Sequence, residues 1–325
     1  MRLIPKKLLI TLTRFSLVVG GLIIAVIAIE YSSRPFLSRY SLDRYRIPDA
    51  KSPVSCRPSD ILPYEYTPNN PEETNSLGMR DKEYSVKKPA GVKRIIFLGD
   101  SITAISRYTD MLEERLQEEF PGRYEVLNFA VAGYSLSEYA ILTQKRILRF
   151  QPDYVVLGLC LNDSGSTWIV YYDEGGELNF YKALSTRYTP LSGWLYKHSN
   201  LYRYLNTLFQ RLSPSVENNE LVLSGKSMSV IRQTLADRNI PLRALLFTHL
   251  MSDERWTPNL KREYYKMTRL LKENQIPYLD MKTVFPSDER VRFRNTPDDI
   301  CHFNGQGDLL VTEAVYRYLK REGFY

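Results

Sequence analysis

Two segments far apart in the chain carry residues that together could transfer an acyl group. Ser101 follows the apolar run 95–98 through a Gly-Asp pair, a pattern that predicts a buried strand ending in a tight turn. About two hundred residues later, Asp299 and His302 stand three positions apart; Asp298 is a rival carboxylate, but the three-residue spacing favours Asp299. A hydroxyl, an imidazole and a carboxylate form an acyl-transfer triad, which is recognised by geometry and not by chain order.

Two further positions could stabilise the negative charge of such a reaction. Gly133 follows the strand-like run 124–129, and Asn162 follows the run 154–161. A glycine lets the backbone approach a substrate and aim its N–H at an oxyanion, and an asparagine amide can donate to the same oxygen. Ligands bind at the carboxyl ends of the strands in open parallel sheets. We therefore expect Gly133 and Asn162 to lie near Ser101.

The other cysteines and histidines fit this chemistry less well. Cys301 is a weak rival nucleophile, Cys160 lies in an apolar run, and three cysteines make no disulfide framework. His198 lies in an aromatic-rich segment, and His249 has no carboxylate at a suitable spacing, which leaves His302 as the candidate base. No cluster has metal-ligand spacing and no phosphate loop occurs. We therefore expect no metal and no organic cofactor.

The elements that must position these residues alternate between strands and helices. The strand-like runs are 93–98, 124–129, 154–161, 242–248 and 277–281. Helical patterns separate most of them, including 139–150, 257–275 and 305–322. Such alternation predicts a parallel sheet covered by helices on both faces, which is a three-layer α/β/α sandwich.

The set of motifs resembles the SGNH, or GDSL-type, hydrolase family. The blocks that match, in order, are Gly99-Asp100-Ser101, Gly133, Asn162 and Asp299-x-x-His302, and the resemblance covers roughly residues 93–320. It implies a flavodoxin-like, five-stranded parallel sheet. The chain departs from the family at Cys160, where a glycine is usual, and this departure weakens inference about the substrate more than about catalysis.

The resemblance also implies roles for the matched residues. Ser101 would be the nucleophile, His302 the general base, and Asp299 the group that orients the imidazole. The backbone N–H groups of Ser101 and Gly133, with the Asn162 amide, would form the oxyanion hole. The implied activity is hydrolysis of a lipid acyl ester or of an O-acetyl group on a carbohydrate, through an acyl-serine intermediate.

Two alternatives remain open. An O-acyltransferase that modifies envelope polysaccharide would use the same residues, with a sugar hydroxyl in place of water. A non-catalytic envelope binding or scaffold protein could keep the fold.

The net charge of +7 comes without basic-aromatic runs or zinc-finger spacing, so no nucleic-acid partner is expected. Nothing in the sequence indicates an oligomeric state.

The amino terminus predicts a membrane anchor. Residues 8–29 are apolar apart from Arg14 and a few small or hydroxylated residues, close to the ~20 residues that a span needs. No convincing cleavage site and no suitably placed cysteine occur, which favours an uncleaved signal anchor over a cleaved signal peptide. Basic residues flank both ends, and the very short leader favours a cytoplasmic amino terminus with a periplasmic or otherwise extracytoplasmic body.

The expected organisation has three parts. Residues 1–30 form the anchor, 31–91 a spacer partly packed on the domain, and 92–325 the hydrolase-like domain. Segment 164–225 interrupts the alternation and is rich in aromatic residues, so we expect an inserted subdomain that is either a lid or a small aromatic core. Residues 173–177 within it are typical of a hairpin turn.

Overall fold

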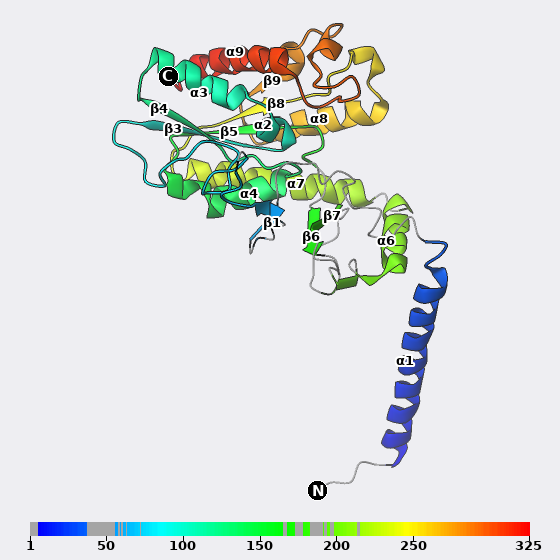
Figure 1. Ribbon diagram of the computed structural model, residues 1–325. Helices are drawn as coiled ribbons and strands as arrows, with labels where there is room; N and C mark the ends of the chain where they lie inside the picture. The colour runs from blue at the N-terminus through cyan, green and yellow to red at the C-terminus, as the bar shows by residue number, and fades with distance from the viewer. Residues whose placement is uncertain are drawn as a thin grey trace.

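The computed structural model describes residues 6–37, 56–57, 59, 61–62, 64–71, 73–164, 168–172, 178–182, 191, 194–195, 198–212 and 215–325. Figure 1 shows a layered body from which one long helix, α1 (Lys6–Ser33), extends.

The predicted parallel sheet is present, with strand order β4-β3-β5-β8-β9. The strands are β3 (Lys93–Gly99), β4 (Tyr124–Asn128), β5 (Tyr154–Leu159), β8 (Leu242–Leu246) and β9 (Tyr278–Asp280). Counted along the chain this is the flavodoxin-like order, whose switch point lies between β3 and β5. Each predicted run therefore contains a strand, and the expected fold class is confirmed.

Helices cover both faces of this sheet (Figure 1). They are α2 (Ser101–Ile105), α3 (Tyr108–Glu119), α4 (Leu136–Lys145), α7 (Ser215–Ala236), α8 (Pro258–Glu273) and α9 (Gly305–Arg321). Short 3₁₀ turns occur at η3 (Ile147–Phe150), η4 (Asp253–Arg255), η5 (Met281–Thr283) and η6 (Arg290–Phe293). Helices α3 and α9 pack on one face, and α4, α7 and α8 on the other.

The alternation of side chains along β3 explains the two layers of core. Ile95 and Phe97 join the cluster under α3 and α9, whereas Ile96 and Leu98 join the cluster under α4, α7 and α8. Successive residues of a strand point to opposite faces, and all four side chains are fully buried. A strand buried on both faces reads as a continuous apolar run, which is why the sequence revealed it.

Two helical features differ from the sequence prediction. The predicted helix 139–150 divides into α4 and the 3₁₀ turn η3, which ends at Gln151 in the left-handed conformation with φ 54°. Helix α7 was not predicted, because its buried Met228, Ile231 and Leu235 stand among many polar residues. This helix also continues across residue 225, the expected end of the insertion.

The segment before the sheet contributes to the core. It contains a small antiparallel pair, β1 (Cys56–Arg57) and β2 (Glu65–Tyr66). Several of its buried side chains join the core cluster under α4, α7 and α8, called here the α4-side core. They are Leu62, Tyr64, Tyr66, Met79 and Tyr84. The turn that follows is closed by the Asn75 side-chain oxygen, which accepts the N–H groups of Leu77 and Met79 at 2.9 Å each.

The expected insertion contains a second antiparallel pair and a helix. Strands β6 (Trp168–Tyr172) and β7 (Leu178–Lys182) pair in register, and α6 (Asn200–Leu212) follows. The hairpin turn predicted at 173–177 lies outside the described residues. The domain boundaries and the role of the aromatic segment stay predictions.

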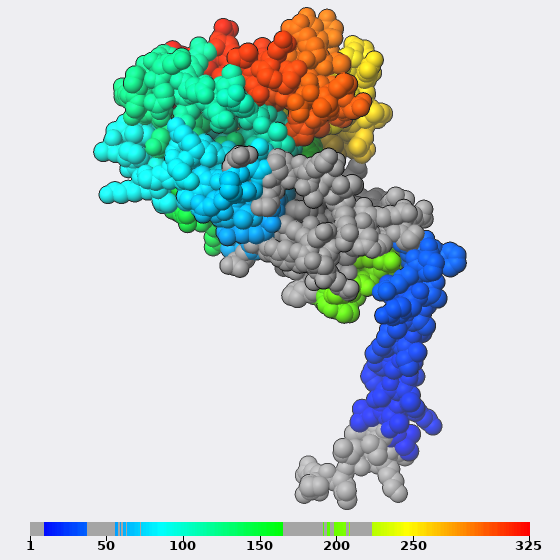
Figure 2. All heavy atoms as spheres, viewed as in Figure 1, coloured from blue at the N-terminus to red at the C-terminus, as the bar shows by residue number. Residues whose placement is uncertain are grey.

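Helix α1 is long and apolar enough to cross a membrane or to serve as a signal sequence. Its segment Ile10–Ser33 has 24 residues and a mean hydropathy of 2.3, and none of its most apolar stretch is buried. Figure 2 shows α1 standing clear of the body along most of its length. At its end, the Glu30 carboxylate accepts the N–H groups of Asn200 and Leu201, both at 3.0 Å, at the start of α6.

Candidate active site

Ser101 stands at the carboxyl edge of the sheet, immediately after the central strand β3. Asp100 follows the strand in an extended conformation, and its carboxylate accepts the Ile102 N–H at 2.9 Å, which caps α2 at its first turn. Burial raises the pKa of Asp100 to about 6, although the Ile102 N–H and the nearby His302 favour the ionised form. The Asp side chain is thus occupied in shaping the turn, and Ser101 is left half-buried with its hydroxyl available.

Two glycines allow α2 to lie directly on the sheet. Gly99 and Gly158 are paired neighbours at the ends of β3 and β5. A Cβ at Gly99 would lie 2.4 Å from the Thr103 Oγ1, and one at Gly158 would lie 2.1 Å from the same atom. Thr103 is fully buried and accepts a hydrogen bond from the Tyr108 hydroxyl at 2.9 Å. Because Gly99 and Gly158 have no side chains, α2, the helix that carries Ser101, can pack closely on the end of the sheet.

The structure brings the predicted hydroxyl, imidazole and carboxylate together. His302 Nε2 lies 2.9 Å from Ser101 Oγ. His302 Nδ1 lies 2.9 Å from Asp299 Oδ2 and 3.1 Å from Asp299 Oδ1. Both His302 and Asp299 are partly open to solvent, with side chains 25% and 23% exposed. This is the connectivity that nucleophile activation by a base requires.

The loop that carries Asp299 and His302 organises its own carboxylate. Asp299 Oδ1 accepts the backbone N–H groups of His302 at 2.9 Å and Cys301 at 3.0 Å. Burial raises the pKa of Asp299, but these two N–H donors and the His302 side chain outweigh it, so the pKa lies below its usual value. An ionised Asp299 can accept from Nδ1–H and leave Nε2 free to take a proton.

Gly133 and Asn162 follow the two strands that flank β3, so they share its edge of the sheet. Gly133 has a φ of +83°, a left-handed conformation that favours glycine. Asn162 is exposed, in a turn held by Asp163, whose Oδ2 accepts the Cys160 N–H at 2.9 Å. Both residues are therefore positioned by defined turns at the predicted end of the sheet.

Two residues that sequence reasoning missed hold the loop of Gly133. The Tyr66 hydroxyl accepts the Ala132 N–H at 2.8 Å, and the Tyr64 hydroxyl donates to the Ala132 carbonyl. Both tyrosines come from the segment before the sheet, and each is 3% exposed. In a chain with 24 tyrosines, no local pattern distinguishes these two.

The rival nucleophiles and bases are placed less favourably. Burial raises the pKa of Cys301 to about 11 and that of Cys160 well above its usual value, so both remain thiols at neutral pH. His198 is exposed and its ring lies 5.0 Å from that of Trp194. His249 is half-buried, and burial lowers its pKa.

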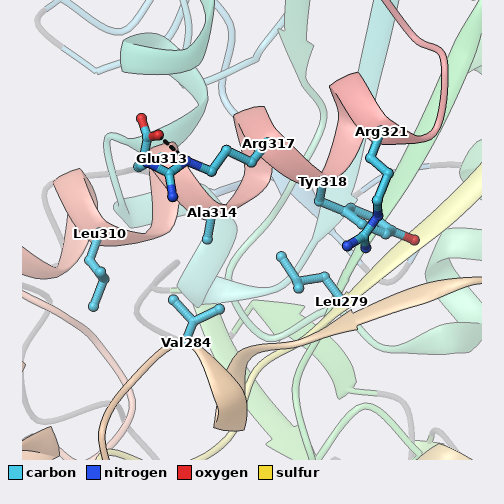
Figure 3. Close-up of a pocket in the computed structure, with 8 residues that line it drawn as sticks. All are labelled: Leu279, Val284, Leu310, Glu313, Ala314, Arg317, Tyr318 and Arg321. Atoms are coloured by element: carbon cyan, nitrogen blue, oxygen red, sulfur yellow. Dashed lines mark hydrogen bonds and ion pairs between the residues drawn. The ribbon is translucent and has the colours of Figure 1, made fainter.

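A separate hollow of about 290 Å³ lies between α9 and the edge of the sheet (Figure 3). The residues that line it are Leu279, Val284, Leu310, Glu313, Ala314, Arg317, Tyr318 and Arg321. Figure 3 shows the ion pair between Glu313 and Arg317 at one side of it. None of these residues belongs to the group around Ser101.

Several solved structures are similar to this chain. In solved structures, the fold is similar to that of the acetyl xylan esterase AlAXEase, with 14% identity over 70% of this chain and 99% of that chain and a TM-score of 0.44. A catalytic mutant of an acetylxylan esterase from Geobacillus stearothermophilus has 13% identity over 72% and 95%, with a TM-score of 0.44. A lipase/acylhydrolase from Enterococcus faecalis has 16% identity over 71% and 97%, with a TM-score of 0.42.

No curated protein sequence matches the chain. The model of the GDSL-like lipase/acylhydrolase family matches residues 97–309, about two thirds of the chain and the whole span from β3 into α9. Membership supports ester hydrolysis as the general activity. The chain belongs to the GDSL-like lipase/acylhydrolase family.

Proposed function

We propose that this protein is a serine ester hydrolase in which Ser101 is the nucleophile, His302 the general base and Asp299 the orienting carboxylate. The observation that carries the proposal is the continuous chain of contacts from Ser101 Oγ to His302 Nε2 and from His302 Nδ1 to Asp299, both at 2.9 Å. The family match gives the same class of chemistry independently of these distances.

The first half-reaction forms the acyl-enzyme. Ser101 Oγ attacks the ester carbonyl carbon as its proton moves to His302 Nε2, and the carbonyl oxygen takes the negative charge of the tetrahedral intermediate. Asp299 stabilises the imidazolium that results. Collapse breaks the bond to the alcohol oxygen, which leaves with the proton from His302. In the second half-reaction, water repeats these steps at the acyl carbon and Ser101 regains its proton.

The oxyanion would be held by the backbone N–H groups of Ser101 and Gly133 and by the Asn162 side chain. The support for this assignment is that all three positions follow adjacent strands β3, β4 and β5 at one edge of the sheet. Removal of one such donor typically costs about a hundred- to a thousandfold in rate.

The proposed substrate is a lipid acyl ester or an O-acetyl group on a carbohydrate. We propose that α1 is an uncleaved anchor and that the body lies on the extracytoplasmic side. A helix with apolar side chains exposed along Ile10–Ser33 is costly in water and is stabilised in a bilayer. An anchored hydrolase meets esters of the membrane and of the adjacent envelope.

A fluorophosphonate probe on the full chain in detergent micelles tests the assignment. Wild type and a Cys301→Ala variant should be labelled and should hydrolyse p-nitrophenyl acetate, whereas Ser101→Ala and His302→Ala should do neither while keeping the wild-type melting temperature. Full turnover by Ser101→Ala would refute the role of Ser101. Transfer of the acyl group to an added sugar in preference to water would instead identify an O-acyltransferase, and a wild type without labelling or turnover would identify a non-catalytic protein.

A further inference from the structure

The loop that carries Gly133 is held by hydrogen bonds on both sides of the glycine. The Val131 N–H donates to the Gly99 carbonyl, and the Tyr134 N–H donates to the Val131 carbonyl, both at 3.1 Å. The Ala132 N–H donates to the Tyr66 hydroxyl at 2.8 Å. Among the described residues, the Gly133 N–H itself has no hydrogen-bond partner. The loop therefore presents one unused donor.

One contact acts on the peptide group that contains this donor. The N–H of Gly133 and the carbonyl of Ala132 belong to the same peptide unit, which is planar and trans. In a trans peptide the C=O and N–H bonds point in opposite directions. The Tyr64 hydroxyl donates to the Ala132 carbonyl, so it fixes the direction in which the Gly133 N–H points.

We propose that Tyr64 is a positioning residue that aims the Gly133 N–H at the oxyanion. This inference rests on the proposed function, because it needs the oxyanion hole assigned above. Tyr64 would act without touching the substrate. It binds the carbonyl of the peptide unit, on the side opposite the N–H.

Tyr64 is itself well placed to hold a fixed direction. Its side chain is buried, and its ring meets that of Tyr134 edge-on at 5.2 Å. The Tyr134 hydroxyl donates to the Tyr64 backbone carbonyl. Burial raises the pKa of Tyr64 well above its usual value, so its hydroxyl remains a donor across the working pH range. A donor to the carbonyl also polarises the peptide, which strengthens the N–H as a donor on the other side.

Tyr84 offers a matched control in the same segment. It is 8% exposed, and its hydroxyl donates to a backbone carbonyl, that of Val126 in β4, at 2.7 Å. Tyr64→Phe and Tyr84→Phe thus each remove one buried hydroxyl and its bond to a backbone carbonyl; the Tyr84 hydroxyl also lies 3.1 Å from Glu113 Oε2 and 3.2 Å from Asp81 Oδ1. Only the first of these bonds involves the peptide unit of Gly133.

The test compares the two variants with wild type as full chains in detergent micelles. For Tyr64→Phe, kcat with p-nitrophenyl acetate should fall by about tenfold or more, but by less than the hundred- to thousandfold loss of a whole donor. Its KM should stay unchanged, because the N–H contributes to the tetrahedral state more than to the bound ester. Binding of a trifluoromethyl ketone, which forms a tetrahedral adduct with the serine, should weaken in parallel with kcat/KM. Tyr84→Phe should lower the melting temperature and keep kcat.

The result that overturns the proposal is a Tyr64→Phe variant that loses thermal stability as Tyr84→Phe does and keeps kcat within a factor of two. Should Tyr64→Phe not fold, Tyr66→Phe replaces it, because it releases the preceding peptide of the same loop. A kcat equal to that of Tyr84→Phe would then refute the idea. A wild type without Ser101-dependent turnover would instead disprove the proposed function, and this inference with it.

Discussion

Replacing Gly158 by Ala should displace the helix that carries Ser101. The added Cβ would lie 2.1 Å from the Thr103 Oγ1, 3.3 Å from the Tyr108 hydroxyl and 3.4 Å from the Thr103 Cβ. Only the first distance is impossible. Thr103 is fully buried and its Oγ1 accepts the hydrogen bond of the Tyr108 hydroxyl, so rotation of the side chain away from the new Cβ would break that bond. We therefore expect the helix itself to move, two residues from the proposed nucleophile Ser101.

The expected magnitudes follow from this overlap. Overpacking of a buried site costs about 1–3 kcal/mol, and each kcal/mol lowers the melting temperature by about 2–4 °C for a domain of this size. A misplacement of about 1 Å at the reacting atoms can cost about a hundredfold in rate. We therefore expect Gly158→Ala to lower kcat by about ten- to a hundredfold.

A second substitution separates this explanation from general damage to the core. Thr103→Ala removes the Oγ1 and keeps the Cβ. It therefore relieves the clash at Gly158, although by itself it leaves the buried Tyr108 hydroxyl without its acceptor, at a cost of about 1–3 kcal/mol. At Gly99 the added Cβ would also lie 2.6 Å from the Thr103 Cβ, so the same substitution cannot relieve Gly99→Ala.

Melting temperatures and initial rates of the two double-mutant cycles provide the assay. The Gly158 pair should show a favourable coupling of about 1 kcal/mol or more and a partial recovery of kcat, whereas the Gly99 pair should be close to additive. Additive effects in the Gly158 pair, or a Gly158→Ala variant with wild-type kcat, would refute the reasoning.

Two further predictions concern stability. Burial raises the pKa of Asp81 to about 7, whereas the same group in the unfolded chain ionises near pH ~3.9. Between these two values the native state binds a proton that the unfolded state has lost. The free energy of unfolding therefore falls as pH rises through this window. Between about pH 4 and pH 7, the melting temperature of Asp81→Asn should fall less than that of wild type. An equal fall in both proteins would disprove the prediction. Arg94 is fully buried and donates to Glu125 at 2.6 Å and to three backbone carbonyls, so Arg94→Met should cost about 3–5 kcal/mol. Adding Glu125→Met should recover part of that loss in the same melting assay; a single variant within 1 °C of wild type would contradict the prediction.

The sheet was predictable because strands buried on both faces have an unbroken apolar sequence. The four consecutive apolar residues Ile95 to Leu98 favour a buried strand, and all four are buried in the structure. The polar residues that follow such strands lie at one edge of a parallel sheet. The position of Ser101 therefore followed from local pattern and fold class. Asp299 and His302 were identified by their three-residue spacing and by the family resemblance, and the structure brings all three residues into contact.

The features that the sequence did not reveal depend on contacts between distant residues. Tyr64 and Tyr66 reach the Ala132 backbone across more than sixty positions, and nothing near them in the chain indicates that target. Helix α7 presents Met228, Ile231 and Leu235 to the core among polar neighbours, so its periodicity is diluted. Gly158 has meaning only beside Thr103 of a neighbouring element.

The burial of the segment before the sheet affects where this protein can be cut. A recombinant version that began at residue 92, where the sequence suggests that the domain starts, would lack Leu62, Tyr64, Tyr66, Met79 and Tyr84. Their removal would expose part of the α4-side core to water. It would also leave the loop that carries Gly133 without the two tyrosine hydroxyls that bind its Ala132 backbone. We therefore expect the smallest unit that folds by itself to begin well upstream of the matched family region, and a truncation series should place its boundary before residue 62.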